Sequence, residues 1–417
     1  MKVGVFTLGC KVNLYESEVM IEKLKKAGYE ILDFNDICDI YIINTCTVTN
    51  NSDKKSRKMI NHVKSLNKDA IIVVCGCFVE SAKDYDFSDI DIVIGNNDKS
   101  NIVSLIQDYL DKNKQVDVRS NIMNACFENM EIESFNDRTR AFVKIQDGCE
   151  NYCSYCIIPF VRGKCRSKSK ELVIEEITNL VKRGYKEVVL TGIHTGNYGV
   201  DLGIKFTDLL EEILKIDGLL RLRISSIEAT EITDKFIELL NNPIICDHLH
   251  IPLQSGSDKI LGYMNRKYDT KYFMEKLEKI RKVRSLINIT TDVIVGFPNE
   301  SDDDFKDSLE FIKKCKFGKV HCFPYSKRNG TRACLMDGHL PNDVKKKRNK
   351  ELIELSNVLE NNYRDMFIGK TLEVLTEKSD DLYSYGHTSN YLYLRVSKCK
   401  SNILCKVVVK KDSFALE

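Results

Sequence analysis

Two series of short apolar runs, each alternating with amphipathic segments, constrain the fold of this chain more than any other feature. The first series occupies residues 1–110. Strands are expected at Val3–Leu8, Ile40–Asn44, Ile71–Cys75 and Ile92–Ile94, and helices at Ser17–Ala27, Asp53–Leu66 and 101–110. Because strands that alternate with helices favour a parallel sheet covered on its faces, an α/β domain is predicted over residues 1–110. A polar, weakly patterned linker is expected at 111–138.

The second series predicts a central domain over residues 139–366. Its strands are expected at Ala141–Gln146, Glu187–Leu190, Leu220–Ser225, His248–Ile251, Ile287–Val295 and Val320–Phe323. Each strand has a helical partner, and six such units predict a partial (β/α)6 barrel whose chemistry lies on loops at the strand carboxyl ends. A long charged helix is expected at 343–365. Short alternating runs at Leu372–Thr376, Tyr391–Val396 and Ile403–Val409 then predict a small β-barrel module over 367–417.

Length and composition narrow the class of protein. A chain of 417 residues is too long for one ordinary core. It has no apolar run of the roughly 18 residues that a membrane span needs, and Met1–Thr7 has the pattern of a strand, not of a signal peptide. A cytoplasmic protein without a membrane partner is therefore expected. The net charge of +2 does not indicate a strong polyanion binder, so a nucleic-acid partner would need local basic patches.

Cysteine is the most informative residue type, because the chain has 16. In a reducing compartment a disulfide framework is not expected, so metal or redox chemistry gains weight. Nine of the cysteines are scattered singly and are interpreted as small buried hydrophobes or incidental surface thiols. These nine are Cys38, Cys126, Cys165, Cys246, Cys315, Cys322, Cys334, Cys399 and Cys405.

Three cysteines lie within eight residues, directly after the first strand of the central domain. They are Cys149, Cys153 and Cys156. A short loop can fold around one cubane cluster and ligate three of its four irons, which leaves the fourth iron open to a small molecule. A structural zinc site is the alternative, but zinc usually takes four ligands in two pairs, and no partner pair is near in sequence.

Three more cysteines each follow a strand of the N-terminal domain. These are Cys10, Cys46 and Cys77. Carboxyl ends of neighbouring parallel strands lie side by side, so the three thiols can converge although they are far apart in sequence. Cys75 falls inside its strand and is the competing candidate for the third position. Gly9 and Gly76 would let the backbone turn sharply there.

Several long motifs resemble the methylthiotransferases of the radical S-adenosylmethionine (SAM) superfamily, and the match covers nearly the whole chain. The spacing of Cys149, Cys153 and Cys156 is the radical SAM signature. The matching segments are Thr7–Ser17, Asn44–Thr49, Gly148–Gly163, Arg223–Glu228, Ile251–Ser257, Gly296–Glu300 and Tyr385–Tyr391. The last of these is similar to the family's TRAM domain.

This resemblance implies a transferase of the MtaB type, which adds a methylthio group to C2 of N6-threonylcarbamoyladenosine at position 37 of tRNA. It implies that Cys149, Cys153 and Cys156 hold the [4Fe–4S] cluster that binds SAM. It also implies that Cys10, Cys46 and Cys77 hold an auxiliary [4Fe–4S] cluster from which sulfur is delivered. The implied partners are tRNA and an external electron donor of flavodoxin or ferredoxin type, and the enzyme is expected to be a monomer.

Other assignments are open to alternatives. Gly192, Glu228 and Gln254 are candidate SAM-binding residues, although an ordinary glycine-rich loop and a solvated carboxylate would explain the first two. No catalytic role is assigned to His194, His248 or His250. For RNA, Tyr391 and Arg395 of the last module are candidates, because aromatic rings and cations together offer stacking surfaces.

Three rival functions remain at this stage. Two are methylthiolation of isopentenyladenosine in tRNA and of an aspartate in a ribosomal protein. The third, from another class, is a non-catalytic metal-cluster protein that binds RNA.

Overall fold

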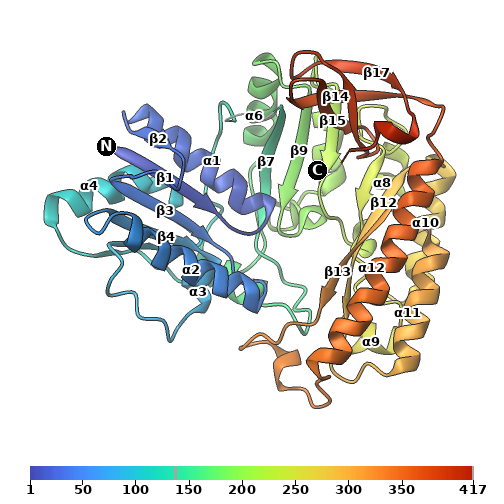
Figure 1. The fold of residues 1–417 in the computed structure, drawn as a ribbon, viewed down its shortest axis with the longest axis horizontal. Helices are drawn as coiled ribbons and strands as arrows, with labels where there is room; N and C mark the ends of the chain where they lie inside the picture. Colours follow the sequence, from blue (N-terminus) through green and yellow to red (C-terminus); the bar gives the residue numbers. More distant parts are fainter. Residues whose placement is uncertain (136–138, 416–417) are drawn as a thin grey trace.

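A six-stranded parallel sheet forms the N-terminal part of the molecule (Figure 1), in a computed structural model that describes residues 1–135 and 139–415. The strand order is β2-β1-β3-β4-β5-β6. The strands are β1 (Lys2–Thr7), β2 (Glu30–Leu32), β3 (Ile40–Thr45), β4 (Ile71–Gly76), β5 (Ile92–Ile94) and β6 (Val116–Asp117). The helices are α1 (Lys11–Lys26), α2 (Asn50–Leu66), α3 (Cys77–Ser81) and α4 (Ile102–Lys112). All residues of β3 and β4 are buried, as expected for central strands covered on both faces.

Two local differences from the sequence prediction bear on the site. Helix α1 begins at Lys11, six residues before the predicted Ser17, with Cys10 as its N-cap. The early start is stabilised by Asn13, whose side-chain amide donates to the carbonyls of Leu8 and Thr45. Part of the predicted linker also has regular structure, because β6 pairs with β5 at the sheet edge. The linker's last residues, 136–138, lie outside the described residues.

The central region is an open barrel of six parallel strands. Isolated bridges from Leu222 to Ile245 and from Ser226 to His250 join a sheet of order β10-β9-β7-β8 to one of order β11-β12-β13. The barrel strands are β7 (Arg140–Asp147), β9 (Glu187–Gly192), β10 (Arg221–Ile224), β11 (His248–His250), β12 (Asn288–Val295) and β13 (Lys319–Pro324); β8 (Arg166–Ser167) pairs antiparallel with β7. The helices of this region are α5 (Ile158–Arg162), α6 (Lys170–Lys182), α7 (Phe206–Ile213), α8 (Asp234–Leu239), α9 (Asp258–Tyr263), α10 (Thr270–Val283) and α11 (Asp302–Cys315).

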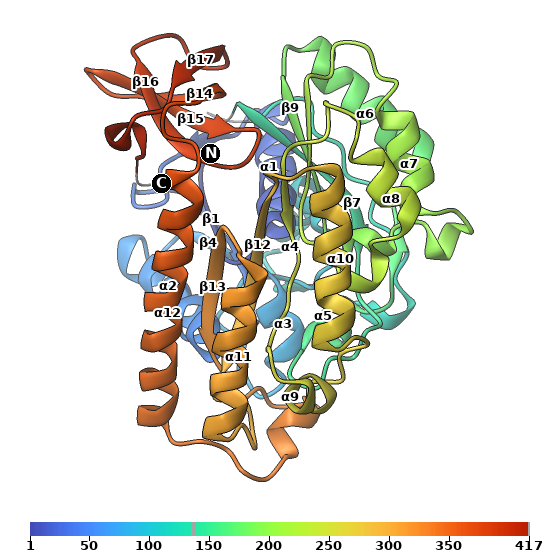
Figure 2. The ribbon, with the colours of Figure 1, turned by 90° about the vertical axis from the view of Figure 1, so that its right-hand side faces the viewer.

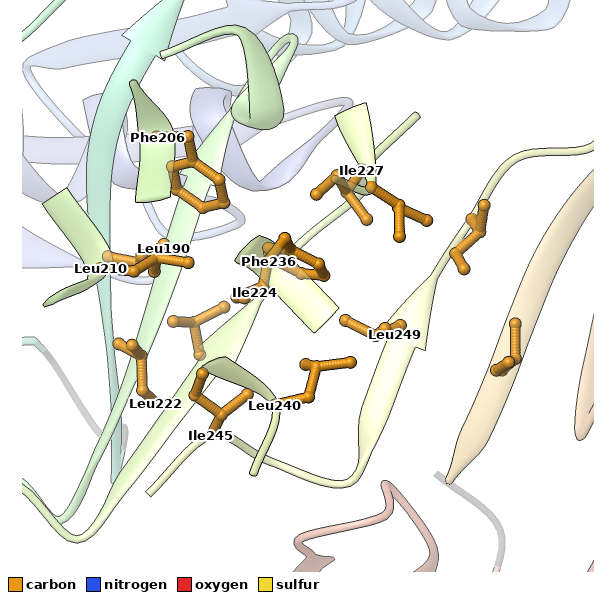
Figure 3. Packing of buried hydrophobic residues seen from close by; sticks show 14 of the residues in the cluster. Leu190, Phe206, Leu210, Leu222, Ile224, Ile227, Phe236, Leu240, Ile245 and Leu249 are labelled. Carbon is orange, nitrogen blue, oxygen red and sulfur yellow. The ribbon is translucent and has the colours of Figure 1, made fainter. Parts of the chain in front are cut away.

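Side chains of the barrel strands alternate between an apolar outer layer and a polar lumen. On β12, Ile289, Val293 and Val295 belong to the main hydrophobic core, whereas Asn288, Thr290 and Asp292 line a cavity. Figure 3 shows the outer layer where helix residues such as Phe206 and Phe236 pack over Leu222 and Ile224 of β10. The alternation leaves hydrogen-bonding groups on the inner side of the barrel.

Helix α12 (Asn342–Asp365) leads to an antiparallel, curled sheet of order β16-β15-β14-β17 at the amino ends of the barrel strands (Figure 2). Its strands are β14 (Thr371–Ser379), β15 (Tyr383–Thr388), β16 (Tyr393–Ser397) and β17 (Leu404–Val408). Arg221 donates to the His387 carbonyl at 3.0 Å, and Asn288 donates to the Asn390 carbonyl at 2.8 Å. The predicted fold class is thus confirmed, with a half-barrel as the last module. Across the described chain, every helix is too short or too polar to cross a membrane.

Candidate functional site

The loop from Gly148 to Ile157 brings the first cysteine set together at the carboxyl end of β7. Gly148 has φ +73°, and a Cβ there would lie 1.9 Å from the Lys164 carbonyl oxygen, so only glycine fits. The Cys149 amide donates to the Gly163 carbonyl at 3.1 Å, and the Cys156 amide donates to the Cys153 carbonyl at 2.9 Å. The loop therefore folds back on itself, with its three thiols half-buried.

The three thiols of this loop share a partly buried environment. Burial, together with the neighbouring Cys153 and Cys149 thiols, raises the pKa of Cys156 to about 12. Without a metal the Cys156 thiol stays protonated at neutral pH, because a buried thiolate needs a compensating cation. A cation already faces one of them, since Arg266 Nη1 donates to Cys153 Sγ at 3.3 Å.

The second cysteine set lies at the carboxyl ends of three adjacent strands. Cys10 follows β1, Cys46 follows β3, and Cys77 opens α3 directly after β4. Cys46 and Cys77 are buried and Cys10 is exposed. Burial raises the pKa of Cys46, and the Cys77 and Cys10 thiols raise it further.

Glycine geometry and packing define this second set further. Gly9 has φ +105°, and a Cβ there would lie 3.0 Å from Cys46 Cβ, so the close approach of the β1 end to Cys46 needs a glycine. Cys75, by contrast, packs in an apolar cluster with Ile94 and Ile102. The packing of Cys75 agrees with choosing Cys77 for the third position.

The donor sets fit a metal cluster better than a single zinc ion. Within the described residues, just one group of three candidate ligand atoms lies entirely within 4.8 Å, namely His250, Asp292 and His321. Tetrahedral zinc with sulfur ligands needs S–S separations of about 3.8 Å. Neither cysteine set is arranged so tightly, whereas three thiolate ligands spread around several irons match the donor chemistry of a cubane.

The two sets share one wall. Ile157, just before α5, and Val161, on α5, pack against Cys77 in a small apolar cluster. Asn96 connects the same elements, because its side-chain amide donates to the Val161 carbonyl at 2.6 Å and to Cys77 Sγ at 3.4 Å. The segment that directly follows Cys156 is therefore in contact with the second set.

A buried cluster of charged side chains stabilises the contact between the two cysteine sets, and it was not predicted from the sequence. The Arg162 side chain is fully buried and contacts Asp147 at 2.9 Å and Glu16 at 3.0 Å. Lys144 contacts Glu16 at 2.7 Å, and Lys99 is a further partner of Glu16. Burial by itself raises the pKa of Glu16, but Arg162, Lys144 and Lys99 together hold it well below its usual value. Glu16 and Arg162 lie within the motifs quoted above, and that was the available signal.

The candidate SAM-binding residues lie at strand ends with different surroundings. Gly192 ends β9, and a Cβ there would lie 3.0 Å from Gln146 Oε1, so glycine allows close packing on β7. Glu228 forms an ion pair with Arg266, the same arginine that donates to Cys153. Gln254 is buried with φ +71° and bridges to Val293 of β12. Of the three, Glu228 is tied to the first cysteine set.

Two residues beside that set were not predicted to be functional. His194 Nδ1 lies 3.8 Å from Cys149 Sγ, and its other nitrogen pairs with Glu231. Burial disfavours the protonated imidazole, but hydrogen bonds to Cys149, Cys165 and Glu231 raise the pKa of His194 to about 12. Cys165, interpreted from sequence as an incidental thiol, accepts from Asn197 at 3.0 Å. His194 follows the barrel strand β9, which was the only signal for it, whereas Cys165 directly precedes β8 and had no such signal.

The candidate RNA-binding residues of the last module face different ways. Tyr391 has φ +63°, and its ring stacks on His248 with centroids 4.7 Å apart, under the Arg223 guanidinium. It therefore faces the barrel lumen and not an outer surface. Arg395 pairs with Asp412 at 3.0 Å and lies over the Tyr383 ring on the exposed side of the module.

A cavity of about 780 Å³ occupies the barrel lumen and extends to α12. Lys11, the residue after Cys10, and Ser226, just beyond β10, form part of its wall. Tyr391 and His248 lie at the opposite end, where the strands begin. The cavity thus reaches from Lys11, next to Cys10 in the chain, down to the last module at the amino ends of the strands.

Family patterns and individual relatives both connect this chain with radical SAM proteins. The Radical SAM superfamily pattern matches residues 143–312, and the uncharacterized protein family UPF0004 matches residues 2–95. The chain is 43% identical to a threonylcarbamoyladenosine tRNA methylthiotransferase MtaB of Bacillus subtilis (strain 168), over 98% of this chain and 93% of that protein. It is 35% identical to a tRNA-2-methylthio-N(6)-dimethylallyladenosine synthase of Acetivibrio thermocellus, over 92% of this chain and 82% of that protein.

Among solved structures, the radical SAM methyltransferase TsrM from Kitasatospora setae has a TM-score of 0.57 at 14% identity. The match covers 77% of this chain and 72% of that one. At this identity the likeness shows the fold alone.

Proposed function

Since the chain belongs to the tRNA methylthiotransferase family of the radical SAM superfamily, we propose that it adds a methylthio group to C2 of N6-threonylcarbamoyladenosine at position 37 of tRNA. The enzyme is a transferase that uses SAM and a [4Fe–4S] cluster. One structural observation supports the proposal: the segment and helix that follow Cys156 pack directly on Cys77, so the two cysteine sets are neighbours. A non-catalytic RNA-binding protein would not need the two sets side by side.

Cys149, Cys153 and Cys156 are proposed to hold the SAM-binding cluster, and Cys10, Cys46 and Cys77 an auxiliary one. When bound, the first cluster and SAM would supply the radical chemistry needed to activate adenine C2, and the auxiliary cluster and a second SAM would supply the sulfur and the methyl group. Such chemistry belongs to cofactors, because an adenine C2–H is far too weakly acidic for a side-chain base.

The protein's own residues position these groups. Arg266 places positive charge beside Cys153 and is itself oriented by Glu228. The Arg162 cluster fixes the first cysteine loop against α1, so both sets keep one relative position. Gly192, Glu228 and Gln254 are proposed to border the SAM site at the strand ends.

Other parts of the proposal concern partners and domains. We assign residues 1–110 to the auxiliary-cluster domain, 139–366 to the radical SAM domain and 367–417 to the tRNA-binding module. Arg395, on the exposed side of that module, is proposed to contact tRNA. The proposed electron donor is a flavodoxin or ferredoxin, the proposed state is a monomer, and the proposed site of action is the cytoplasm.

The decisive experiment is mass spectrometry of nucleosides from total tRNA. A host lacking its own methylthiotransferases would express the wild type, Cys149→Ala, or Cys126→Ala, which removes an exposed thiol outside both sets. We expect 2-methylthio-N6-threonylcarbamoyladenosine with the wild type and Cys126→Ala only. If 2-methylthio-N6-dimethylallyladenosine appeared instead, the substrate would be N6-dimethylallyladenosine, the isopentenyladenosine named above as a rival. Absence of both, with iron and sulfide present, would favour a ribosomal-protein substrate.

A further inference from the structure

The floor of the lumen cavity contains buried hydrogen-bonding atoms without partners. His248 and Asn288 open β11 and β12, and both are more than nine-tenths buried. His248 Nδ1 and Asn288 Oδ1 have no hydrogen-bond partner among the described residues, and both side chains line the cavity. Each such atom costs free energy when left unsatisfied, and these two belong to residues that line a cavity of about 780 Å³, which has room for a polar ligand.

A second ring of polar groups lies one step further along the same strands. Thr290 Oγ1 hydrogen-bonds with His248 Nε2 at 3.0 Å and with His250 Nδ1 at 2.9 Å. His250 Nε2 lies 3.2 Å from Asp292 Oδ2, and His321 of β13 is beside them. Thr290 thereby fixes the orientation of two imidazoles, which pre-organises the cavity wall for directional hydrogen bonds.

The charges around the cavity also favour one kind of ligand. Its wall carries three cationic side chains, Lys11, Lys319 and Arg364, against two carboxylates, Asp292 and Glu360. Burial and neighbouring cations lower the pKa of His248 well below its usual value, so this imidazole is neutral and can both donate and accept. A ligand with hydroxyl, N–H and carboxylate groups would match these surroundings.

We propose that this cavity binds the N6 substituent of the target adenosine, and that its floor, His248 and Asn288 braced by Thr290, selects a threonylcarbamoyl group over a dimethylallyl group. This inference rests on the proposed function and names the residues that set its specificity. A threonylcarbamoyl group carries the hydroxyl, urea-type N–H and carboxylate that the floor can bind. A dimethylallyl group would leave His248 Nδ1 and Asn288 Oδ1 buried and unpaired, which is the strongest basis for rejecting an analogue.

The location of the cavity supports this assignment. Lys11 connects the cavity wall to Cys10, and Ser225 in the same wall hydrogen-bonds with Thr195 at 2.9 Å, in the loop after β9. An adenosine whose C2 lies near the cysteine sets can therefore direct its N6 substituent into the lumen. Tyr391 closes the far end, so the substituent would be enclosed.

The test measures binding and reaction separately, with anaerobically reconstituted holoenzyme. Fluorescence anisotropy would give the Kd of two anticodon stem-loops that differ only in carrying N6-threonylcarbamoyladenosine or N6-dimethylallyladenosine. His248→Phe keeps the ring that stacks on Tyr391 but removes both nitrogens. Thr290→Val keeps the side-chain shape and releases both imidazoles. His62→Phe, on α2 and away from the cavity, is the matched control.

We expect the wild type and His62→Phe to prefer the threonylcarbamoyl stem-loop by about tenfold or more. The two cavity variants should lose most of this preference, while 5′-deoxyadenosine formation from SAM without tRNA stays unchanged. If His248→Phe does not fold, Thr290→Val decides.

Three results would overturn the inference. In the first, folded cavity variants keep the wild-type preference. In the second, the preference is lost with EDTA and restored by zinc, which would assign His250, Asp292 and His321 to a metal site. In the third, wild-type enzyme methylthiolates only the dimethylallyl stem-loop, and then the proposed function fails as well. Normal methylthiolation of the threonylcarbamoyl stem-loop by the cavity variants, with preference intact, would leave the proposed function standing.

Discussion

The two cysteine sets are built in opposite ways, although they lie against the same helix. The first comes from one loop, so its three thiols are fixed within eight residues of chain by Gly148 and two local backbone hydrogen bonds. The second comes from three strand ends separated by more than 30 residues each, and exists only because β1, β3 and β4 are neighbours in the sheet. The first set thus depends on local sequence, and the second depends on the whole N-terminal fold.

The largest expected effect separates the roles of the two sets. Cys149→Ala should lower methylthiolation by at least about 10³-fold, because no side chain can replace the radical chemistry. Cys77→Ala should abolish methylthiolation as well, but should retain 5′-deoxyadenosine formation from SAM, since the first set is intact. Both products would be quantified by mass spectrometry after anaerobic reconstitution.

Iron analysis tests the same comparison independently. We expect about eight irons per chain for the wild type and for Cys126→Ala, and about four for each of the two variants. If Cys77→Ala kept eight irons, or if it lost SAM cleavage together with methylthiolation, the division of roles between the sets would be wrong.

The contrast also explains what could be predicted from sequence. The placement of Cys149, Cys153 and Cys156 in one loop could be predicted from their spacing, and that of Cys10, Cys46 and Cys77 at neighbouring strand ends from their positions after predicted strands. That these cysteines hold clusters stays a prediction. The strands themselves were predictable because their residues are apolar and the turns are marked by polar residues. Strand β15 was missed because Tyr383–Thr388 mixes polar and aromatic residues without an apolar run.

Features set by tertiary contacts could not be predicted in this way. Nothing local indicates that Glu16, on an otherwise amphipathic helix, is fully buried against Arg162, 146 residues later. Tyr391 was expected to offer an RNA-stacking surface, but its left-handed backbone turns the ring toward His248. In both places the position of a side chain is set by a partner from a distant element, which periodicity does not reveal.

The second-largest effect concerns the junction between the two sets. Glu16→Gln would leave Lys99, Lys144 and Arg162 buried without their shared carboxylate. Breaking such a cluster costs about 3–5 kcal/mol, and we expect urea denaturation of the metal-free protein to show this loss. Glu22→Gln, on the same helix, removes the charge that pairs with the exposed Lys26 but keeps a side-chain oxygen that can accept from the Glu133 amide, so it should cost less than about 1 kcal/mol. Equal losses for both variants would contradict a structural role for the cluster.

A pH series sharpens this prediction. Because its cationic partners hold the pKa of Glu16 well below its ordinary value of 4.5, its ionised form stabilises the fold fully above about pH 4.5. Below that pH the unfolded chain takes up a proton first, so the stability gap between wild type and Glu16→Gln should shrink by about 1.4 kcal/mol per pH unit. A gap that stayed constant from pH 7 to pH 3 would show that Glu16 is not held ionised in the folded protein.

The smallest expected effect is on the free energy of unfolding of two glycine variants, and it separates backbone strain from steric crowding at the second cysteine set. Gly9 and Gly28 flank α1, and both have positive φ, +105° and +87°. A Cβ on Gly28 meets nothing within 4 Å, whereas one on Gly9 would lie 3.0 Å from Cys46 Cβ. Gly28→Ala should therefore cost about 1 kcal/mol from backbone strain alone, and Gly9→Ala about 2 kcal/mol. Urea denaturation of the metal-free proteins would measure both.

The two alanine variants should also differ in metal binding. Since a methyl group on Gly9 would press on Cys46, Gly9→Ala should weaken iron retention at the second set, while Gly28→Ala should retain the wild-type iron content. Neither should change 5′-deoxyadenosine formation, because that reaction depends on the locally built first set. If Gly9→Ala instead lowered both iron retention and 5′-deoxyadenosine formation, the contact between α5 and Cys77 would couple the two cysteine sets structurally. The first set would then not be independent of the N-terminal fold.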